Sequence, residues 1–212
     1  MSEDVIIPRS PMAKLIANHF SPFLKQSPKT ALDLCCGSGS GSGCIGIALA
    51  LHMQIPQVDM VDIATAALLL SQKNINEHNM AHQVQVFKAD LFSGLPAHKY
   101  DLIVSNPPYV DAEDYDDMPA EFSHEPKLAL VSGFDGLDLT AAMLAQPADW
   151  MSEQSLLVIE VGNSEVALQQ ALSKIPFMWL DLSLGGNGFF CLTGSQCHQY
   201  QARFKAWQLG RA

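Results

Sequence analysis

The chain has 212 residues, of which 48% are hydrophobic and 16% are charged, and its formal net charge is −10. A chain of this length can bury a core as one domain, and the composition suits a sheet covered by helices. The negative charge disfavours direct binding to a nucleic-acid backbone and favours a basic protein partner. An acidic start and the lack of a long apolar run predict a cytoplasmic protein without a membrane span.

Cysteine and histidine spacing gives no sign of a metal site. The five cysteines include no CxxC pair, and the seven histidines lack the spacing of metal ligands. We therefore expect neither a disulfide framework nor a bound metal, and free thiols agree with a reducing compartment.

Apolar segments of strand length alternate with segments of helical periodicity along the whole chain. Helices are predicted over 12–24 (with Ser10 as N-cap), 44–52, 64–79, 137–151, 165–175 and 195–209. Strands are predicted over 30–35, 57–62, 83–89, 101–105, 156–161, 177–184 and 189–193. The last two strands are joined only by 185–188, a glycine-rich link typical of a hairpin, so the final strand should be antiparallel. We predict a single α/β domain over 1–212, doubly wound, with a seven-stranded and mostly parallel sheet.

A glycine loop lies between the first predicted strand and the next helix. Glycines there let the backbone approach a ligand and leave the first N–H groups of the helix free for an anion. The candidate cofactor-binding residues in and before this loop are Asp33, Gly37, Gly39, Gly41 and Gly43. A flexible turn would show the same glycines, so this pattern alone is weak.

Further carboxylates end the neighbouring strands, at the edge where an open α/β sheet binds its ligand. Asp62 can accept hydrogen bonds from both ribose hydroxyls, and Asp59 lies three residues earlier on the same strand. Asp90, followed by Leu91, can accept from an adenine amino group. Each alone is equally explained as a solvated strand end or a cap, but together with the glycine loop they predict a nucleoside cofactor.

The segment Asn106-Pro107-Pro108-Tyr109 directly follows the fourth predicted strand and is the most specific signal. The Asn106 side-chain oxygen and the Pro107 carbonyl can each accept one N–H of a planar nitrogen, which fixes its plane for attack. The ring of Tyr109 can stack on this group and lie near a sulfonium. A rigid turn is the structural alternative. We predict that Asn106, Pro107 and Tyr109 are catalytic, that all four residues bind the substrate, and that Asn106 also contacts the cofactor.

Six motifs resemble the bacterial glutamine N(5)-methyltransferases and cover essentially the whole chain. They are Ile7-Pro8-Arg9-Ser10-Pro11, Leu32-Asp33-Leu34-Cys35, Cys44-Ile45-Gly46-Ile47-Ala48, Val61-Asp62-Ile63, Ser105-Asn106-Pro107-Pro108-Tyr109-Val110-Asp111 and Glu160-Val161-Gly162-Asn163. The resemblance implies S-adenosylmethionine as cofactor, S-adenosylhomocysteine as product, and methylation of a glutamine side-chain amide. The start at Pro8 and the acidic run after Tyr109 resemble the branch that modifies a large-subunit ribosomal protein. The sibling branch, which modifies release factors, remains an alternative.

Three features depart from that family. Its first loop has one Gly-Ser-Gly, which is doubled here, so anchoring on the strand selects Gly37 and Gly39 whereas anchoring on the helix selects Gly41 and Gly43. Lys14 stands where the family usually has a glutamate. The helical N-terminal domain of the family has no counterpart in the sequence, which we interpret as the catalytic domain alone.

Other functions are weighed against this one. DNA adenine methyltransferases also use an Asn-Pro-Pro-aromatic segment to hold a flipped base, but the acidic charge and the lack of a basic recognition domain disfavour them. A nicotinamide oxidoreductase and a non-catalytic ribosome-associated module are weaker alternatives. The run 111–125 contains seven acidic residues, and we hypothesise that it steers a lysine-rich partner, although a solvated loop is the simpler interpretation.

Overall fold

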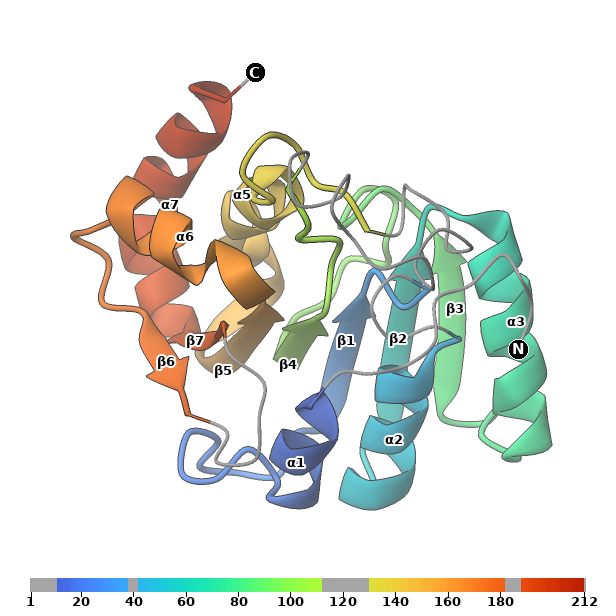
Figure 1. The fold of residues 1–212 in the computed structure, drawn as a ribbon. Helices are drawn as coiled ribbons and strands as arrows, with labels where there is room; N and C mark the ends of the chain where they lie inside the picture. The colour runs from blue at the N-terminus through green and yellow to red at the C-terminus, as the bar shows by residue number, and fades with distance from the viewer. Residues whose placement is uncertain (1–10, 38–41, 112–129, 182–187, 212) are drawn as a thin grey trace.

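The computed structural model describes residues 11–37, 42–111, 130–181 and 188–211. Seven strands within these ranges form one sheet in the order β3-β2-β1-β4-β5-β7-β6 (Figure 1). They are β1 (Thr30–Leu34), β2 (Gln57–Asp62), β3 (Val84–Lys88), β4 (Tyr100–Ser105), β5 (Met151–Glu160), β6 (Met178–Leu180) and β7 (Phe189–Thr193). β7 runs antiparallel to both of its neighbours, β5 and β6, and all other neighbouring strands of this sheet are parallel. The predicted fold class, with its antiparallel last strand, is confirmed.

Helices cover both faces of this sheet. They are α1 (Met12–Ala17), α2 (Cys44–Met53), α3 (Thr65–Glu77), α5 (Asp138–Leu144), α6 (Glu165–Ala171) and α7 (Gly194–Leu209), with short 3-10 turns η3 (Pro147–Trp150) and η4 (Gly162–Ser164). One buried cluster joins α1, α2 and α3 to the sheet, and a second cluster joins α5, α6 and α7 to it. In Figure 1, α1 and α2 lie in front of the strands. None of the helices in the described ranges is long and apolar enough to cross a membrane.

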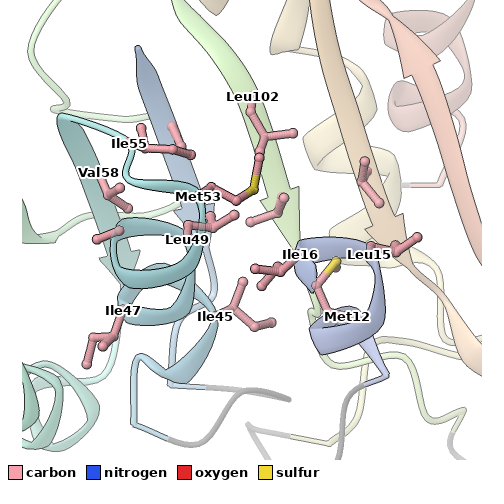
Figure 2. Close-up of a cluster of buried hydrophobic side chains, with 14 of the residues drawn as sticks. Met12, Leu15, Ile16, Ile45, Ile47, Leu49, Met53, Ile55, Val58 and Leu102 are labelled. Atoms are coloured by element: carbon pink, nitrogen blue, oxygen red, sulfur yellow. The ribbon is translucent and has the colours of Figure 1, made fainter. Parts of the chain in front are cut away.

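The strands supply side chains to both clusters because successive residues point to opposite faces. On β4, Leu102 and Val104 belong to the first cluster and Ile103 to the second. Figure 2 shows Leu102 beside the side chains of α2, with Met12, Leu15 and Ile16 of α1 extending the same cluster. The central strands are therefore buried on both sides, and binding groups are left to their ends.

Three predicted helices are too long, and the one predicted over 165–175 ends at Ala171. The first ends at Ala17 rather than residue 24, because His19 and Phe20 adopt left-handed φ values of 52° and 51° that reverse the chain and still bury Phe20. The helix predicted over 137–151 is interrupted, since Pro147 cannot continue it and instead begins η3. The predicted cap Ser10 and most of the link 185–188 lie outside the described residues.

Candidate functional site

The carboxyl ends of β1, β2, β3 and β4 lie at one edge of the sheet because these strands are parallel. The Ser105 hydroxyl at the end of β4 donates a hydrogen bond to the Leu34 carbonyl oxygen at the end of β1, at 2.8 Å. Leu34 in turn is paired in register with Val61 on β2. Adjacent strands thus place Asp33, Asp62 and Asn106 at the same edge.

Asn106 follows β4 directly and is only 3% exposed. Its side-chain oxygen is buried and accepts no hydrogen bond from any described residue. A buried acceptor without a partner costs about 1–3 kcal/mol, so such atoms are rare in folded proteins. The unmet acceptor has the chemistry needed to take an N–H group of a bound ligand.

The end of β5 contacts the rest of the segment 106–109. Pro107 and Pro108 are buried, whereas Tyr109 is partly exposed. The Tyr109 hydroxyl donates a hydrogen bond to Oε1 of Glu160 at 3.1 Å. Burial, followed by the negative charge of Glu160, raises the pKa of the Tyr109 phenol above its usual range. Tyr109 therefore remains a neutral hydrogen-bond donor at all physiological pH values.

Asp62 organises the start of the glycine loop. Its Oδ2 accepts the Gly37 N–H at 2.8 Å and its Oδ1 accepts the Ala64 N–H at 2.8 Å, and the side chain is 5% exposed. Each carboxylate oxygen keeps a second lone pair, so the predicted contacts with ribose hydroxyls remain available.

Asp33 lies one strand away and is almost fully buried. Its Oδ2 accepts the Gly46 N–H in the first turn of α2 at 2.9 Å, while its Oδ1 has no partner among the described residues. Burial raises the pKa of the Asp33 carboxyl from an ordinary 3.8 to about 8; the Gly46 hydrogen bond opposes this rise and the Asp62 charge adds to it. A cation at this edge would favour the charged form of Asp33.

Packing fixes both ends of the doubled glycine loop. The structure therefore favours neither Gly37 with Gly39 nor Gly41 with Gly43 as the pair of cofactor-binding glycines. A Cβ on Gly37 would lie 2.0 Å from the Ala67 Cβ, and one on Gly43 would lie 2.2 Å from the Met60 Cε. The Gly43 N–H donates to the Cys36 carbonyl oxygen at 3.0 Å, which closes the loop at its base. The other two predicted loop residues, Gly39 and Gly41, lie outside the described residues.

Asp90 and Leu91 lie at the edge of the sheet that carries the candidate site, whereas Asp59 does not. Asp90 is exposed just beyond β3, and Leu91 beside it is buried with a left-handed φ of 51°. Asp59 does not reach this edge: its Oδ2 accepts the hydroxyl of Tyr100 at 2.7 Å, with His98 at 3.6 Å. The acidic run lies outside the described residues except for Asp111.

Sequence reasoning missed a set of residues that contact the Tyr109 segment. Ser164 lies 3.1 Å from the Tyr109 carbonyl oxygen and 2.9 Å from the Asp135 carbonyl oxygen. Asp135 is in turn bound by Arg211. The signal for Glu160 was an acidic residue directly after the apolar run 156–159, but no sequence pattern indicated Ser164 or the pairing of Asp135 with Arg211.

A separate hollow of about 600 Å³ lies at the opposite edge of the sheet. Its lining includes Lys29, Asp101, Glu153 and Thr193 but none of the predicted site residues. In the described part of the chain, no group of three or more His, Cys, Asp or Glu side chains is arranged to hold a metal ion.

The family comparison matches the region that carries most of this geometry. The model of the methyltransferase small domain matches residues 12–135. The chain belongs to this methyltransferase family. A "Ribosomal protein uL3 glutamine methyltransferase" from Francisella tularensis is 44% identical over 209 residues, covering 98% of this chain and 65% of that protein. A protein of the same name from Neisseria gonorrhoeae is 42% identical over 199 residues, covering 92% of this chain and 64% of that one. The predicted resemblance is confirmed, and the chain spans slightly less than two thirds of these relatives.

Solved structures show the same methyltransferase fold at low identity. The catalytic domain of hMettl16, solved with an RNA hairpin, superposes with a TM-score of 0.70 at 12% identity, covering 90% of this chain and 72% of that one. A ribosomal protein L11 methylase from Lactobacillus delbrueckii gives a TM-score of 0.54 at 18% identity, covering 85% of this chain and 74% of that one. These likenesses bear on the fold of the family and not on the substrate.

Proposed function

We propose that this chain transfers a methyl group from S-adenosylmethionine to the side-chain amide nitrogen of a glutamine in a large-subunit ribosomal protein. The observation that carries the proposal is the buried Asn106 oxygen, which has no partner among the described residues. It follows the strand next to β1, whose end carries Asp33 and the glycine loop. The two relatives named for glutamine methylation of ribosomal protein uL3 support the choice of substrate.

The cofactor would be held at the ends of β1 and β2. Asp62 offers carboxylate lone pairs to the ribose hydroxyls, and Asp90 would accept from the adenine amino group. Gly37 and Gly43 have no room for side chains because Ala67 and Met60 pack against them, and this packing fixes both ends of the loop that would hold the cofactor. S-adenosylmethionine supplies the reactive methyl group on a positively charged sulfur, a charge that the nearby acidic groups favour.

Asn106 and Pro107 would hold the substrate amide from one side. The Asn106 oxygen accepts one amide N–H and the Pro107 carbonyl accepts the other, which fixes the plane of a weakly nucleophilic nitrogen. Bound S-adenosylmethionine would supply the methyl group to the lone pair of this nitrogen, and the electrons of the broken C–S bond would remain on the cofactor sulfur. The amide nitrogen then releases one proton to water, so no protein base is required beforehand. Tyr109 provides a flat apolar surface against the amide.

The partner is proposed to be a basic protein. With a net charge of −10, the chain would attract a lysine-rich ribosomal protein and repel free nucleic acid. Because the chain spans only 65% of the Francisella relative, its docking to a whole ribosomal protein is also a proposal.

The test is to incubate the chain with S-adenosylmethionine labelled on its methyl group. Separate reactions contain purified ribosomal protein uL3, a peptide carrying its candidate glutamine, a release factor, and duplex DNA. Mass spectrometry then maps the label. We expect it on one glutamine side chain of uL3 or its peptide. Label on the release factor would move the chain to the sibling branch, and label on DNA, or no transfer even to peptide, would refute the proposal.

A further inference from the structure

We propose that the segment 160–164, at the end of β5, is a positioning element that fixes the Tyr109 ring and thereby the plane of the substrate amide. This inference rests on the proposed function, and it gives a role to the motif that begins at Glu160. Three separate contacts from this one segment converge on Tyr109, three residues after Asn106.

The first contact holds the phenol. Glu160 is the last residue of β5 and only 5% exposed, and its Oε1 accepts the Tyr109 hydroxyl hydrogen at 3.1 Å. A carboxylate costs free energy to bury, so an apolar side chain would serve better if this position only ended a strand. Because the pKa of the phenol is raised by burial and by the Glu160 charge, its proton stays in place for this contact.

The second contact is steric and lies along the ring. Gly162 has a left-handed φ of 48°, and a Cβ there would lie 2.4 Å from the Tyr109 Cε2. Gly188 packs against the Gly162 backbone, since a Cβ on Gly188 would lie 2.1 Å from the Gly162 carbonyl oxygen. The Val161 N–H also donates to the Gly188 carbonyl oxygen at 2.7 Å. Gly162 therefore cannot move away from the ring, and the ring is confined on that face.

The third contact holds the backbone. The single hydroxyl proton of Ser164 is shared between the carbonyl oxygens of Tyr109, at 3.1 Å, and Asp135, at 2.9 Å. Ser164 is 6% exposed, so water competes poorly for this proton. With phenol, ring and carbonyl each held, Tyr109 has one orientation before substrate arrives, which is the arrangement that lowers the entropic cost of reaction.

The test compares Glu160→Leu, which removes the acceptor, with Glu160→Gln, which keeps an oxygen able to accept the phenol proton. Both are made alone and together with Tyr109→Phe. The matched controls are Glu153→Leu and Glu153→Gln, at the exposed start of the same strand. Measured quantities are kcat and KM for the glutamine peptide, the affinity for S-adenosylmethionine, and the melting temperature of the free protein.

We expect Glu160→Leu to lower kcat about 10- to 100-fold, the scale for misplacing a reacting group, while affinity for S-adenosylmethionine changes less than about twofold. Glu160→Gln should recover most of this loss. In the Tyr109→Phe background, Glu160→Leu should cost little more, because coupled residues are not additive. The Glu153 variants should match the wild type.

A second pair of variants covers the case in which Glu160→Leu does not fold. Ser164→Ala should lower kcat, whereas Ser155→Ala, a buried serine on β5 bonded to Ser152, should lower the melting temperature without lowering kcat. Gly162→Ala should lower kcat by displacing the ring. Equal kcat in all these variants, or additive losses with Tyr109→Phe, would overturn the inference while leaving the proposed function intact. A wild-type protein that methylates no glutamine would instead defeat the proposed function.

Discussion

Arg211 binds Asp135 with both terminal nitrogens of its guanidinium group. This pair connects the residues after α7 to the segment just before α5. The same guanidinium contacts Asp138 and lies 5.1 Å from the centre of the Trp207 ring. Planar bidentate pairs of this kind are stronger and more specific in direction than single ion pairs. Since the Asp135 carbonyl oxygen also accepts the Ser164 hydroxyl hydrogen, the pair supports the segment that contacts Tyr109.

Arg211→Ala should lower the free energy of unfolding by about 1–2 kcal/mol, because it removes several charged hydrogen bonds, of which those to Asp135 are partly buried and those to Asp138 are exposed. The matched control is Lys205→Ala, which removes an exposed pair with Asp149 at 3.9 Å and should cost less than about 0.5 kcal/mol. Urea denaturation measures both. Equal effects of the two substitutions would show that the Arg211 pair is no stronger than an ordinary surface pair.

The Arg211 contribution should depend on pH. Burial alone would raise the pKa of Asp135, but the hydrogen bond and charge of Arg211 hold it below the ordinary 3.8. A depressed carboxyl pKa stabilises the fold above the unfolded value and loses this contribution as pH falls through the folded value. The stability difference between wild type and Arg211→Ala should therefore be constant from pH 7 to about 5 and shrink below about 4.

Asp33 should produce the opposite dependence. Its pKa is about 8 in the folded chain against an ordinary 3.8, so between these values the folded state retains a proton that the unfolded state has released. Stability from Asp33 is then lost as pH rises through this window, by up to about 1.4 kcal/mol per pH unit. Asp33→Asn should flatten the curve of urea midpoint against pH between 5 and 8. A variant curve parallel to that of the wild type would contradict the prediction.

Asp62→Asn should weaken S-adenosylmethionine binding about 10- to 100-fold, because an amide keeps one acceptor oxygen where the carboxylate has two. Asp59→Asn provides the control on the same strand. Asp59 is buried and accepts the Tyr100 hydroxyl, so its substitution should cost about 1–3 kcal/mol of stability without changing cofactor affinity. Isothermal titration calorimetry separates the two; equal losses of affinity would argue against a specific role for Asp62.

Asn106→Ala should lower kcat for the glutamine peptide about 10²- to 10³-fold, the usual cost of removing one positioned polar group. Because the Asn106 oxygen has no partner among the described residues, the free protein should lose little stability. A melting curve and single-turnover kinetics check the two parts. A strongly destabilised variant would mean that Asn106 is structural.

Alanine substitution in the glycine loop should be costly at both of its fixed ends. At Gly43, φ is 75° and the Met60 Cε lies 2.2 Å from the added Cβ, so Gly43→Ala should cost at least about 1–2 kcal/mol. Gly37→Ala meets the Ala67 Cβ at 2.0 Å and should also destabilise. Gly210→Ala, with ordinary contacts of 3.5 Å, should be neutral. A neutral Gly43→Ala would show that this end of the loop rearranges freely.

The sequence predicted the sheet well because its signals are local. Segment 189–193 is short, apolar and flanked by glycines, segment 57–62 is short and follows a proline, and the structure contains strands with the same limits. The error at Phe20 arose because a buried aromatic residue at helical spacing can equally be buried by a turn. The break at Pro147 arises because proline has no backbone N–H to continue a helix, although apolar residues at helical spacing lie on both sides of it.

Candidate site residues could be predicted from the sequence where the end of a single strand determines their position. Asp62 ends β2 and Asn106 directly follows β4, so parallel pairing alone brings them to one edge. Glu160 and Ser164 contact Tyr109, and Asp135 contacts Ser164, only across segments that are far apart in the sequence. Asp59 shows the limit in reverse: it lies on the same strand as Asp62 but three residues earlier, and its carboxylate accepts the Tyr100 hydroxyl instead.

The strand order at the end of the sheet constrains how the chain can assemble during synthesis. β6 is made before β7, yet among the described strands it pairs with β7 alone, and β7 lies between it and β5. Until β7 arrives, the β5 edge has an open row of backbone donors and acceptors, and β6 has no partner. The nascent sheet therefore closes from the middle outward, and the Glu160 end of β5, which contacts Tyr109, is covered by β7 only in that last step.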